Sequence, residues 1–386
     1  MTMEWLERRK LLALGAAALT AMSVAACGSS NNNSSSSSSS GTKSTAAAAD
    51  SGTAALQKIV DAHKTADTIG PTDPITKPIP KNKSIVYVNC GAPACVTQGQ
   101  ALTAAGKALG WKVSTINAQP TPQAVQAAFD EVIRRHPDGT ASAGLGRSLY
   151  PKQIDKMNKL GIAVFSAEGE QESGEGGIEL DPVGPKYTAN AMRYLADKAI
   201  VDIGGQGEVA DVLLGGFPIV KKYTQGWKDE MTAKCPKCTQ KELVVQPTSL
   251  GKDAPQLVAN FLRANPKIKA IYLSYDLIGS GLPAAAKGAG VTVPKTYSWG
   301  VDTAGIRAVQ TGERTASAPD PFQEVGWQLA DGFARKFAGM PVSGAQKFQN
   351  AVVWSKDFGN VPASGNPFPP VVKDYQAQFK KLWGVK

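Results

Sequence analysis

The most constraining feature of this 386-residue chain is an alternation of short apolar runs with longer amphipathic segments, which begins at Lys83. The first run, residues 85–88, precedes Gly91 and Pro93 and is typical of a buried parallel strand. Further strands are expected at residues 112–116, 141–145 and 162–165, and helices at residues 98–109, 122–135 and 151–160. Because strands that alternate with helices at this spacing form a parallel sheet, we predict a doubly wound α/β fold.

The alternation restarts after Asp181. Helices are expected at residues 187–200, 223–234, 254–265 and 279–288, and strands at residues 208–214, 243–246, 270–274 and 296–300. Two consecutive runs of this kind predict two similar lobes, each with its own sheet. Ligands of open α/β sheets bind at the carboxyl ends of the strands, so two such edges that face each other would form a binding cleft.

The N-terminal residues 1–26 are typical of an export signal. Arg8, Arg9 and Lys10 precede an apolar run from 11 to 26, which is shorter than the ~20 residues that a spanning helix needs. The run ends in Val24-Ala25-Ala26-Cys27, which resembles a bacterial lipoprotein box, so Cys27 would carry lipid. An ordinary signal anchor with a chance cysteine is the alternative, and export by the twin-arginine or the general route stays open.

Residues 27–54, rich in Ser, Asn and Ala, are predicted to form a flexible tether. Residues 55–82 are expected to hold an N-terminal helix, within residues 54–69, and a proline-rich connector. The protein would thus be lipid-anchored on the extracytoplasmic face of the cell membrane. Anionic lipid or acidic envelope polymer would explain the net charge of +10 without a nucleic-acid partner.

Five cysteines minus Cys27 leave an even number, which outside the cell favours disulfides, with three pairings open. The close pairs Cys90–Cys95 and Cys235–Cys238 are the preferred candidates, and a four-cysteine zinc site is the rival. Cys90 follows a predicted strand and belongs near the cleft, whereas Cys235 and Cys238 precede theirs and belong on the far side of the other lobe. This separation argues against a shared metal site, and we predict no metal and no cofactor.

The sequence offers little material for catalysis. There are only two histidines, His63 and His136, and the expectation for His63 is a packed helix face. Ser249 and Lys252 fit Ser-x-x-Lys, but this pattern is short and no partner motif accompanies it. Glycine-rich segments near residues 144 and 204 lack the full dinucleotide fingerprint. We therefore predict that the chain is not an enzyme, with a hydrolase on the same fold as a weak alternative.

Three stretches resemble the ribose-type periplasmic sugar-binding proteins of bacterial ABC importers. They are AAGKALGWKV at 104–113, LVANFLRANPKIKAIYLSYD at 257–276 and GVDTAGIRAVQTGERTASAPDPFQEVG at 300–326. The resemblance covers residues 83–341 and implies two Rossmann-like lobes joined by a three-strand hinge, with crossovers near Glu168, Asp302 and Phe337. The N-terminal lobe would comprise 83–168 plus 303–337, and the C-terminal lobe 169–302 plus 338–386.

The resemblance implies a solute-binding protein whose lobes close around a small ligand. In the family, the closed form docks on a membrane permease whose ATPase drives import, so the expected partners are a small solute and such a permease, with the protein as a monomer. A sensor that presents its ligand to a membrane receptor is the alternative. Repressors that share this fold need an N-terminal helix-turn-helix, and here a signal and a serine tract take that place.

Several ligand-binding candidates follow from the resemblance by position. Asp302 matches the family's late aspartate, and Glu168 stands where the family has an aspartate, although Gly169 replaces the arginine that usually follows. Tyr223 stands where the family has a ligand arginine, and Tyr275 replaces an asparagine.

Other candidates complete the expected site. Asp276 is kept next to Tyr275, Leu250 replaces an aromatic residue, and Pro93 lies in a turn that has lost its aromatics. Trp299 lies in the core or lines the cleft, and the core is favoured. Because most sugar-gripping residues are absent, we expect a neutral or weakly cationic ligand that is more apolar than a pentose. A hexose or polyol held by different residues is the alternative.

Overall fold

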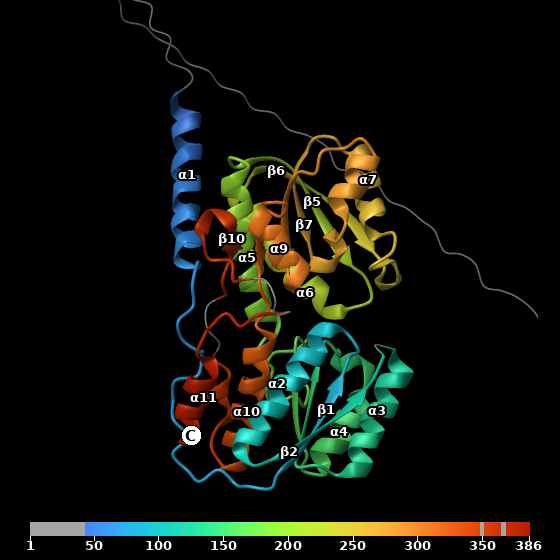
Figure 1. Ribbon diagram of the computed structural model, residues 1–386, viewed down its shortest axis with the longest axis vertical. Coiled ribbons are helices and arrows are strands. Elements are labelled where there is room, and N and C mark those ends of the chain that lie inside the picture. Colours follow the sequence, from blue (N-terminus) through green and yellow to red (C-terminus); the bar gives the residue numbers. More distant parts are fainter. Residues whose placement is uncertain (1–42, 120, 348–350, 364–367) are drawn as a thin grey trace, which may run out of the picture. The chain divides into compact units, whose positions relative to one another are not determined.

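The computed structural model describes residues 43–119, 121–347, 351–363 and 368–386. The predicted export signal and Cys27 lie outside the described residues. Within them, two separate sheets alternate with helices, as Figure 1 shows. Short 3-10 helices occupy Arg147–Leu149, Pro247–Ser249, Asp276–Gly279, Val342–Ala345 and Lys356–Phe358.

The first sheet has four parallel strands in the order β2-β1-β3-β4. They are β1 (Ser84–Asn89), β2 (Lys112–Asn117), β3 (Gly139–Ala143) and β4 (Ala163–Ala167). Three helices alternate with them: α2 (Pro93–Leu109), α3 (Pro122–Arg135) and α4 (Pro151–Lys159). The start of α3 follows directly from the sequence, because the Thr121 side chain accepts a hydrogen bond from the Ala124 amide and Pro122 occupies the first turn. We call this sheet and the helices packed on it the first lobe.

The second sheet has six strands in the order β10-β9-β8-β7-β5-β6. They are β5 (Gln206–Leu214), β6 (Lys237–Val245), β7 (Ile268–Leu273), β8 (Lys295–Trp299), β9 (Ala316–Ala318) and β10 (Trp354–Ser355). All neighbours pair in parallel except β10, which is antiparallel to β9. The helices of this second lobe are α5 (Pro185–Asp202), α6 (Pro218–Lys234), α7 (Ala254–Ala264), α8 (Leu282–Gly288) and α9 (Thr303–Thr311).

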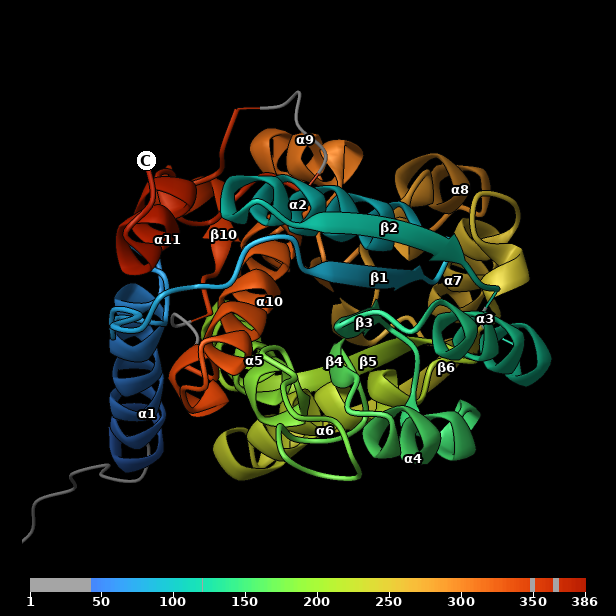
Figure 2. The same cartoon turned by 90° about the horizontal axis from the view of Figure 1, so that it is seen from below.

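Helices cover both faces of each sheet. In the first lobe α2 packs against α10 (Phe322–Phe337), while α3 packs against α4 on the opposite face, an arrangement visible in Figure 2. In the second lobe one apolar core joins α5 and α6 to the sheet, and another joins α7 and α8 to it. The predicted α/β fold with two Rossmann-like lobes is thus confirmed.

The predicted lobe boundaries are wrong in three places. Residues 303–318 belong to the second lobe, because β9 pairs with β8 and Ile306 of α9 packs with Val301 and Trp354. Residues 169–183 stay with the first lobe, where Leu180 forms an isolated bridge to Phe165. The chain therefore passes to the second lobe near residue 184, back to the first at 319–321, and to the second again between Ala345 and Trp354, later than predicted in each case. It then returns to the first lobe before the C-terminal helix.

The C-terminal helix is the third difference. We expected residues 338–386 in the second lobe, but α11 (Tyr375–Trp383) packs on α10 in the first lobe. The decisive contact is Trp383 stacked on Trp327, with ring centroids 5.3 Å apart and planes 3° apart. Large aromatic surfaces of this kind contribute much of a core's stability, so this pair decides where the C-terminus lies.

The N-terminal helix α1 (Lys43–Ala62) differs from its prediction at both ends. It begins inside the predicted tether, where an alanine run gives the highest helix propensity, and it ends before residue 69. Leu56 and Val60 are buried, and Leu56 joins the second-lobe core. His63 stacks on Tyr194 with centroids 3.6 Å apart, so its predicted packing role is confirmed.

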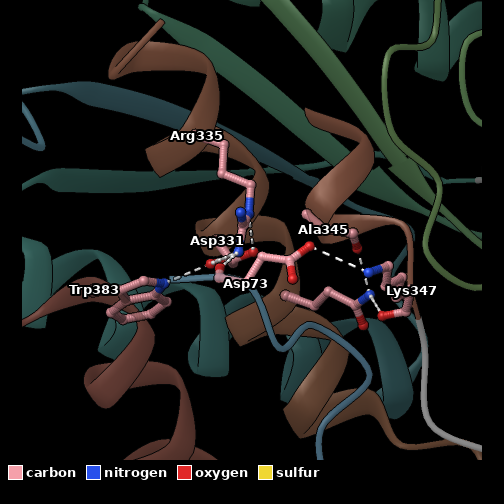
Figure 3. Close-up of polar contacts among 7 residues, drawn as sticks. Asp73, Asp331, Arg335, Ala345, Lys347 and Trp383 are labelled. Carbon is pink, nitrogen blue, oxygen red and sulfur yellow. Dashed lines mark hydrogen bonds and ion pairs between the residues drawn. The ribbon is translucent and has the colours of Figure 1, made fainter. Parts of the chain in front are cut away.

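A polar network around the buried Asp331 and Arg335 holds the connector after α1 to the first lobe, as Figure 3 shows. Asp331 of α10 accepts hydrogen bonds from Arg335 Nε at 2.7 Å and from Trp383 Nε1 at 2.8 Å. The Arg335 guanidinium also donates to the Asp73 carbonyl at 2.7 Å, and Asp73 pairs with Lys347 at 3.2 Å. Asp331 and Arg335 together thereby join three segments that are far apart in sequence.

We expect Asp331→Ala to lower the free energy of unfolding by about 3–5 kcal/mol, because it leaves the Arg335 guanidinium buried without its counter-ion. Chemical denaturation followed by circular dichroism would measure this change. Glu179→Ala is the matched control. It breaks the surface ion pair of Lys336, which lies on the same helix α10 as Asp331, and should cost less than about 1 kcal/mol. Equal losses in the two variants would contradict the assignment.

Candidate functional site

A cavity of about 280 Å³ lies at the carboxyl ends of the strands of both sheets. The first lobe contributes the turn after β1, single residues after β3 and β4, and Phe322 of α10, and the second lobe contributes residues at or after the ends of β5 to β8. The lining residues are Cys90, Ala92, Pro93, Ala94, Cys95, Gly144, Glu168, Leu214, Phe217, Ile219, Val220, Tyr223, Pro247, Leu250, Tyr275, Leu277, Trp299, Gly300 and Phe322. We call it the central cavity. It is the cleft that parallel strand order predicts.

The structure brings most of the predicted ligand-binding residues together at this cavity. Those that line it are Glu168, Tyr275, Tyr223, Leu250, Pro93 and Trp299. Asp302 and Asp276 do not line it, although both follow strands of the same sheet edge.

Asp276 has a structural environment. It is buried and forms an ion pair with Arg314, which is also buried, and it accepts a hydrogen bond from Ser298 Oγ at 2.7 Å. These contacts tie together the ends of β7 and β8 and the start of β9. The Asp276 carboxylate is thus already neutralised within the second lobe.

Asp302 caps a helix. Its Oδ1 accepts a hydrogen bond from the Gly305 amide at 2.8 Å, which makes it the N-cap of α9. It lies along a separate cavity of about 240 Å³, which also contains Asp276 and Arg314. An aspartate at the end of a strand can either bind a ligand or cap the next helix, and Asp302 caps a helix.

Glu168 is the only Asp or Glu among the described residues that line the central cavity. Glu168 directly follows β4 and has a left-handed backbone with φ of 53°, a conformation that few residues with a side chain adopt. Its carboxyl accepts a hydrogen bond from Trp299 and lies within hydrogen-bond reach of the Asp320 carboxyl. Trp299, predicted to favour the core, is 2% exposed and yet borders the cavity, so it serves both places.

Two further carboxyl groups lie near Glu168 and Asp320. Asp181 Oδ2 accepts a hydrogen bond from the Gly169 amide at 2.7 Å, and Glu324 Oε1 accepts one from the Val372 amide at 2.9 Å. Burial raises the pKa of Asp181 to about 7 and that of Glu324 to about 8. Burial also raises the pKa of Glu168, and burial with the neighbouring Glu168 carboxyl raises that of Asp320 well above its usual range. We call Glu168, Asp181, Asp320 and Glu324 the acid cluster.

Sequence reasoning missed much of the apolar wall and one acid. The missed wall residues include Phe217, Ile219, Val220, Leu277 and Phe322. The missed acid is Asp320, whose position in the Asp-Pro step after the last parallel strand was the available signal. Among the described residues that line the cavity, the ionisable side chains are those of Glu168, Tyr223 and Tyr275. These lining residues include no Lys, Arg or His.

The structure pairs the cysteines as preferred, Cys90 with Cys95 and Cys235 with Cys238. The first disulfide borders the central cavity, as expected for Cys90. The second joins the end of α6 to β6, and Cys238 lies within β6 rather than before it, because that strand begins at Lys237. The two pairs lie in different lobes, so the four sulfurs do not form one site.

A protein-family model described as a periplasmic binding protein domain matches residues 85–338. This chain belongs to that family. The family resemblance of the sequence is thereby confirmed. None of the curated protein sequences matches the chain significantly.

Solved structures show the same fold. An ABC sugar transporter subunit from Rhodobacter sphaeroides has a TM-score of 0.62 and 21% identity, over 72% of this chain and 99% of that chain. A solute-binding protein from Agrobacterium vitis with bound allitol has a TM-score of 0.62 and 21% identity, over 72% and 97%. A chain of a XylFII–LytSN complex has a TM-score of 0.60 and 17% identity, over 72% and 99%. In the part of this chain that the structure describes, no helix combines the length and apolarity needed to cross a membrane.

The acid cluster should make stability depend on pH. Since the folded-state pKa values of Asp181 and Glu324 lie above the unfolded values of about 4, their contribution is greatest at low pH and is lost as the pH rises towards 8. We expect the melting temperature of the unliganded protein to fall between pH 5 and pH 9, measured by calorimetry.

Glu324→Gln should flatten this decline, because a neutral amide still accepts the hydrogen bond from the Val372 amide. Glu131→Gln is the control. Hydrogen bonds from Arg135 and Arg134 lower the pKa of that carboxyl, so Glu131 stays ionised from pH 5 to pH 9 and its replacement should not change the slope. An unchanged slope in Glu324→Gln would show that this residue does not titrate as described.

Proposed function

We propose that this protein is an extracytoplasmic solute-binding lipoprotein of an ABC importer, which captures one small solute between its two lobes. The observation that supports this proposal best is the central cavity, because its walls come from the strand ends of both lobes. A solute in that position gains its full set of contacts only when the lobes approach each other. Closure is then favoured by the difference in affinity between the closed and open states.

The lining favours a solute with an apolar body. Phe217, Val220, Leu250, Leu277 and Phe322 offer no hydrogen bond from their side chains, so each hydroxyl of a sugar placed against them would lose a water partner without replacement. Two of the similar structures are, by their descriptions, a sugar transporter subunit and a complex with allitol. A sugar-like solute held near Glu168, Tyr223 and Tyr275 is therefore the alternative.

The anchor and the partner belong to the same proposal. The lipoprotein box at Cys27 would hold the protein on the outer face of the cell membrane, close to the permease that receives the solute. The protein would act as a monomer. Replacing Cys27 with Ala should abolish incorporation of labelled palmitate and release the protein from membranes in its host. Retention of label in that variant would contradict lipidation at Cys27.

A sensor that presents its ligand to a membrane receptor is the second candidate. It is favoured by one observation, the similarity to XylFII in a complex with a second protein, LytSN. The two candidates differ in what binds the closed form, so pull-down of membrane proteins with the liganded protein separates them: a permease supports import, and a receptor supports sensing. For the hydrolase alternative, neither Ser249 nor Lys252 is among the described residues that line the cavity.

Solute binding itself is tested by calorimetry and small-angle scattering with a panel that contains D-ribose, D-allose, allitol and apolar alcohols and amines. We expect at least one apolar member to bind with micromolar or tighter affinity and to reduce the radius of gyration as the lobes close. Tight binding of a pentose would contradict the hypothesis that the solute has an apolar body. A panel without any binding or any closure would contradict the proposed function.

Leu250→Asn should weaken binding of the apolar solute by roughly 10-fold or more, because burying a leucine side chain is worth about 1.5–3 kcal/mol and each 1.4 kcal/mol is tenfold. Leu257→Asn is the matched control, because Leu257 is a 37% exposed leucine of α7 that does not line the cavity. Calorimetric titrations of both variants measure the effect. Equal affinities would place the solute elsewhere.

A further inference from the structure

The acid cluster contains a buried pair of carboxyl groups that reaches the central cavity. Glu168 follows β4 and Asp320 follows β9, so the pair joins residues from both sheets. Asp320 is 1% exposed, and neither of its carboxylate oxygens accepts a hydrogen bond from an N–H or hydroxyl group of the described residues. Its neighbour is the Glu168 carboxyl, and two carboxyl groups bond to each other only by sharing a proton. A pair that shares one proton in this way holds one negative charge.

Nothing in the described part of the chain neutralises this charge. The titratable groups that face the pair are Asp181, Glu324, Tyr87, Tyr187, Tyr223 and Tyr275, all of them acids, and burial raises the pKa of each tyrosine so that it stays neutral. No ion pair among the described residues includes a member of the acid cluster, whereas the buried Asp276 and Asp331 each have an arginine. A buried charge without a partner is costly, so this site favours a cation.

We propose that the solute is an organic amine, whose ammonium group binds the Glu168–Asp320 pair and whose apolar body fills the rest of the central cavity. This proposal rests on the proposed function, in which the cavity is the solute site. An ammonium with one positive charge balances the single negative charge of the pair. Its N–H groups donate to the Glu168 carboxyl, the member of the pair that lines the cavity.

The rings around Glu168 suit the same group. Trp299 and Tyr223 both line the cavity, with ring centroids 6.0 Å apart, and Tyr275 lines it as well. Aromatic faces attract an ammonium through their quadrupole, with an effect of about 2 kcal/mol where water is excluded. Phe217, Val220 and Phe322 line the same cavity and offer apolar surface to the carbon skeleton. The lining thus combines one acidic group and aromatic rings, which suit a cation, with apolar surface.

Matched pairs of amines and alcohols test the proposal by calorimetry at pH 7.5 with the full chain. The probes are cyclohexylmethylamine and cyclohexylmethanol, 2-phenylethylamine and 2-phenylethanol, and tryptamine and tryptophol. Members of a pair share a carbon skeleton and differ in charge. We expect the amine to bind at least 10-fold more tightly than its alcohol in at least one pair. Equal or tighter binding of the alcohols, or binding of no amine, would overturn the proposal.

Variants locate the effect. Glu168→Gln and Asp320→Asn should each weaken binding of the best amine at least 10-fold and change binding of its alcohol less than 3-fold. Glu313→Gln is the control, because Glu313 is an exposed carboxyl of the second lobe outside the central cavity, and both affinities should stay unchanged. If both cavity variants bind the amine like the unaltered protein, the ammonium lies elsewhere and the proposal is wrong.

A pH series supplies a readout that does not depend on any variant. Because burial raises the pKa of both carboxyl groups, lowering the pH protonates the pair and removes its charge, so affinity for the amine should fall while affinity for the alcohol stays constant. An amine affinity that stays unchanged down to the lowest pH at which the protein remains folded would overturn the proposal. Sugar binding with lobe closure but without amine binding would refute the amine and leave the solute-binding function intact, whereas a panel with no binding at all would refute both.

Discussion

Parallel pairing within two separate sheets is the constraint on which the rest of this structure depends. Because the strands of each parallel set run in one direction, the residues that follow them meet at one edge. The central cavity draws its walls from the ends of β1, β3 and β4 and from the start of α10 in the first lobe, and from the ends of β5 to β8 in the second. The two disulfides and the side-chain caps of α3 and α9 lie in or beside segments that connect these strands to helices.

Most of the fold could be predicted from the sequence because strands and helices have different apolar periods. Thr121 and Pro122 even give the first turn of α3. Lobe membership was harder, because it depends on contacts between distant segments. Strand β9 has three residues, too few to show a period, and only its pairing with β8 assigns residues 303–318 to the second lobe. The position of α11 depends likewise on the stacking of Trp383 on Trp327, which no local pattern encodes.

The candidate site was predictable to the extent that position along a strand decides it. Residues directly after strands, such as Glu168 and Tyr275, do line the cavity. The same rule misplaced Asp276 and Asp302, since it does not say which way a side chain points. Asp276 turns to Arg314, a partner 38 residues away, and Asp302 turns to the amide of Gly305. Asp320 was not predicted as a site residue, because its role depends on the neighbouring Glu168 carboxyl. This contact joins residues that follow strands of different sheets, and no local pattern encodes it.

The acid cluster links the chemistry of the cavity to the connections between the lobes. Asp181 lies just before the crossing near residue 184, and Asp320 lies within the crossing at 319–321. Beyond the effect of burial, the Asp181 carboxyl raises the pKa of Asp320, so the charge that the cluster bears depends on how closely the two connections approach. A cation at Glu168 would relieve this repulsion at the place where the lobes are joined. Binding and closure would then share one electrostatic cause, and a neutral solute would have to close the lobes through apolar contacts alone.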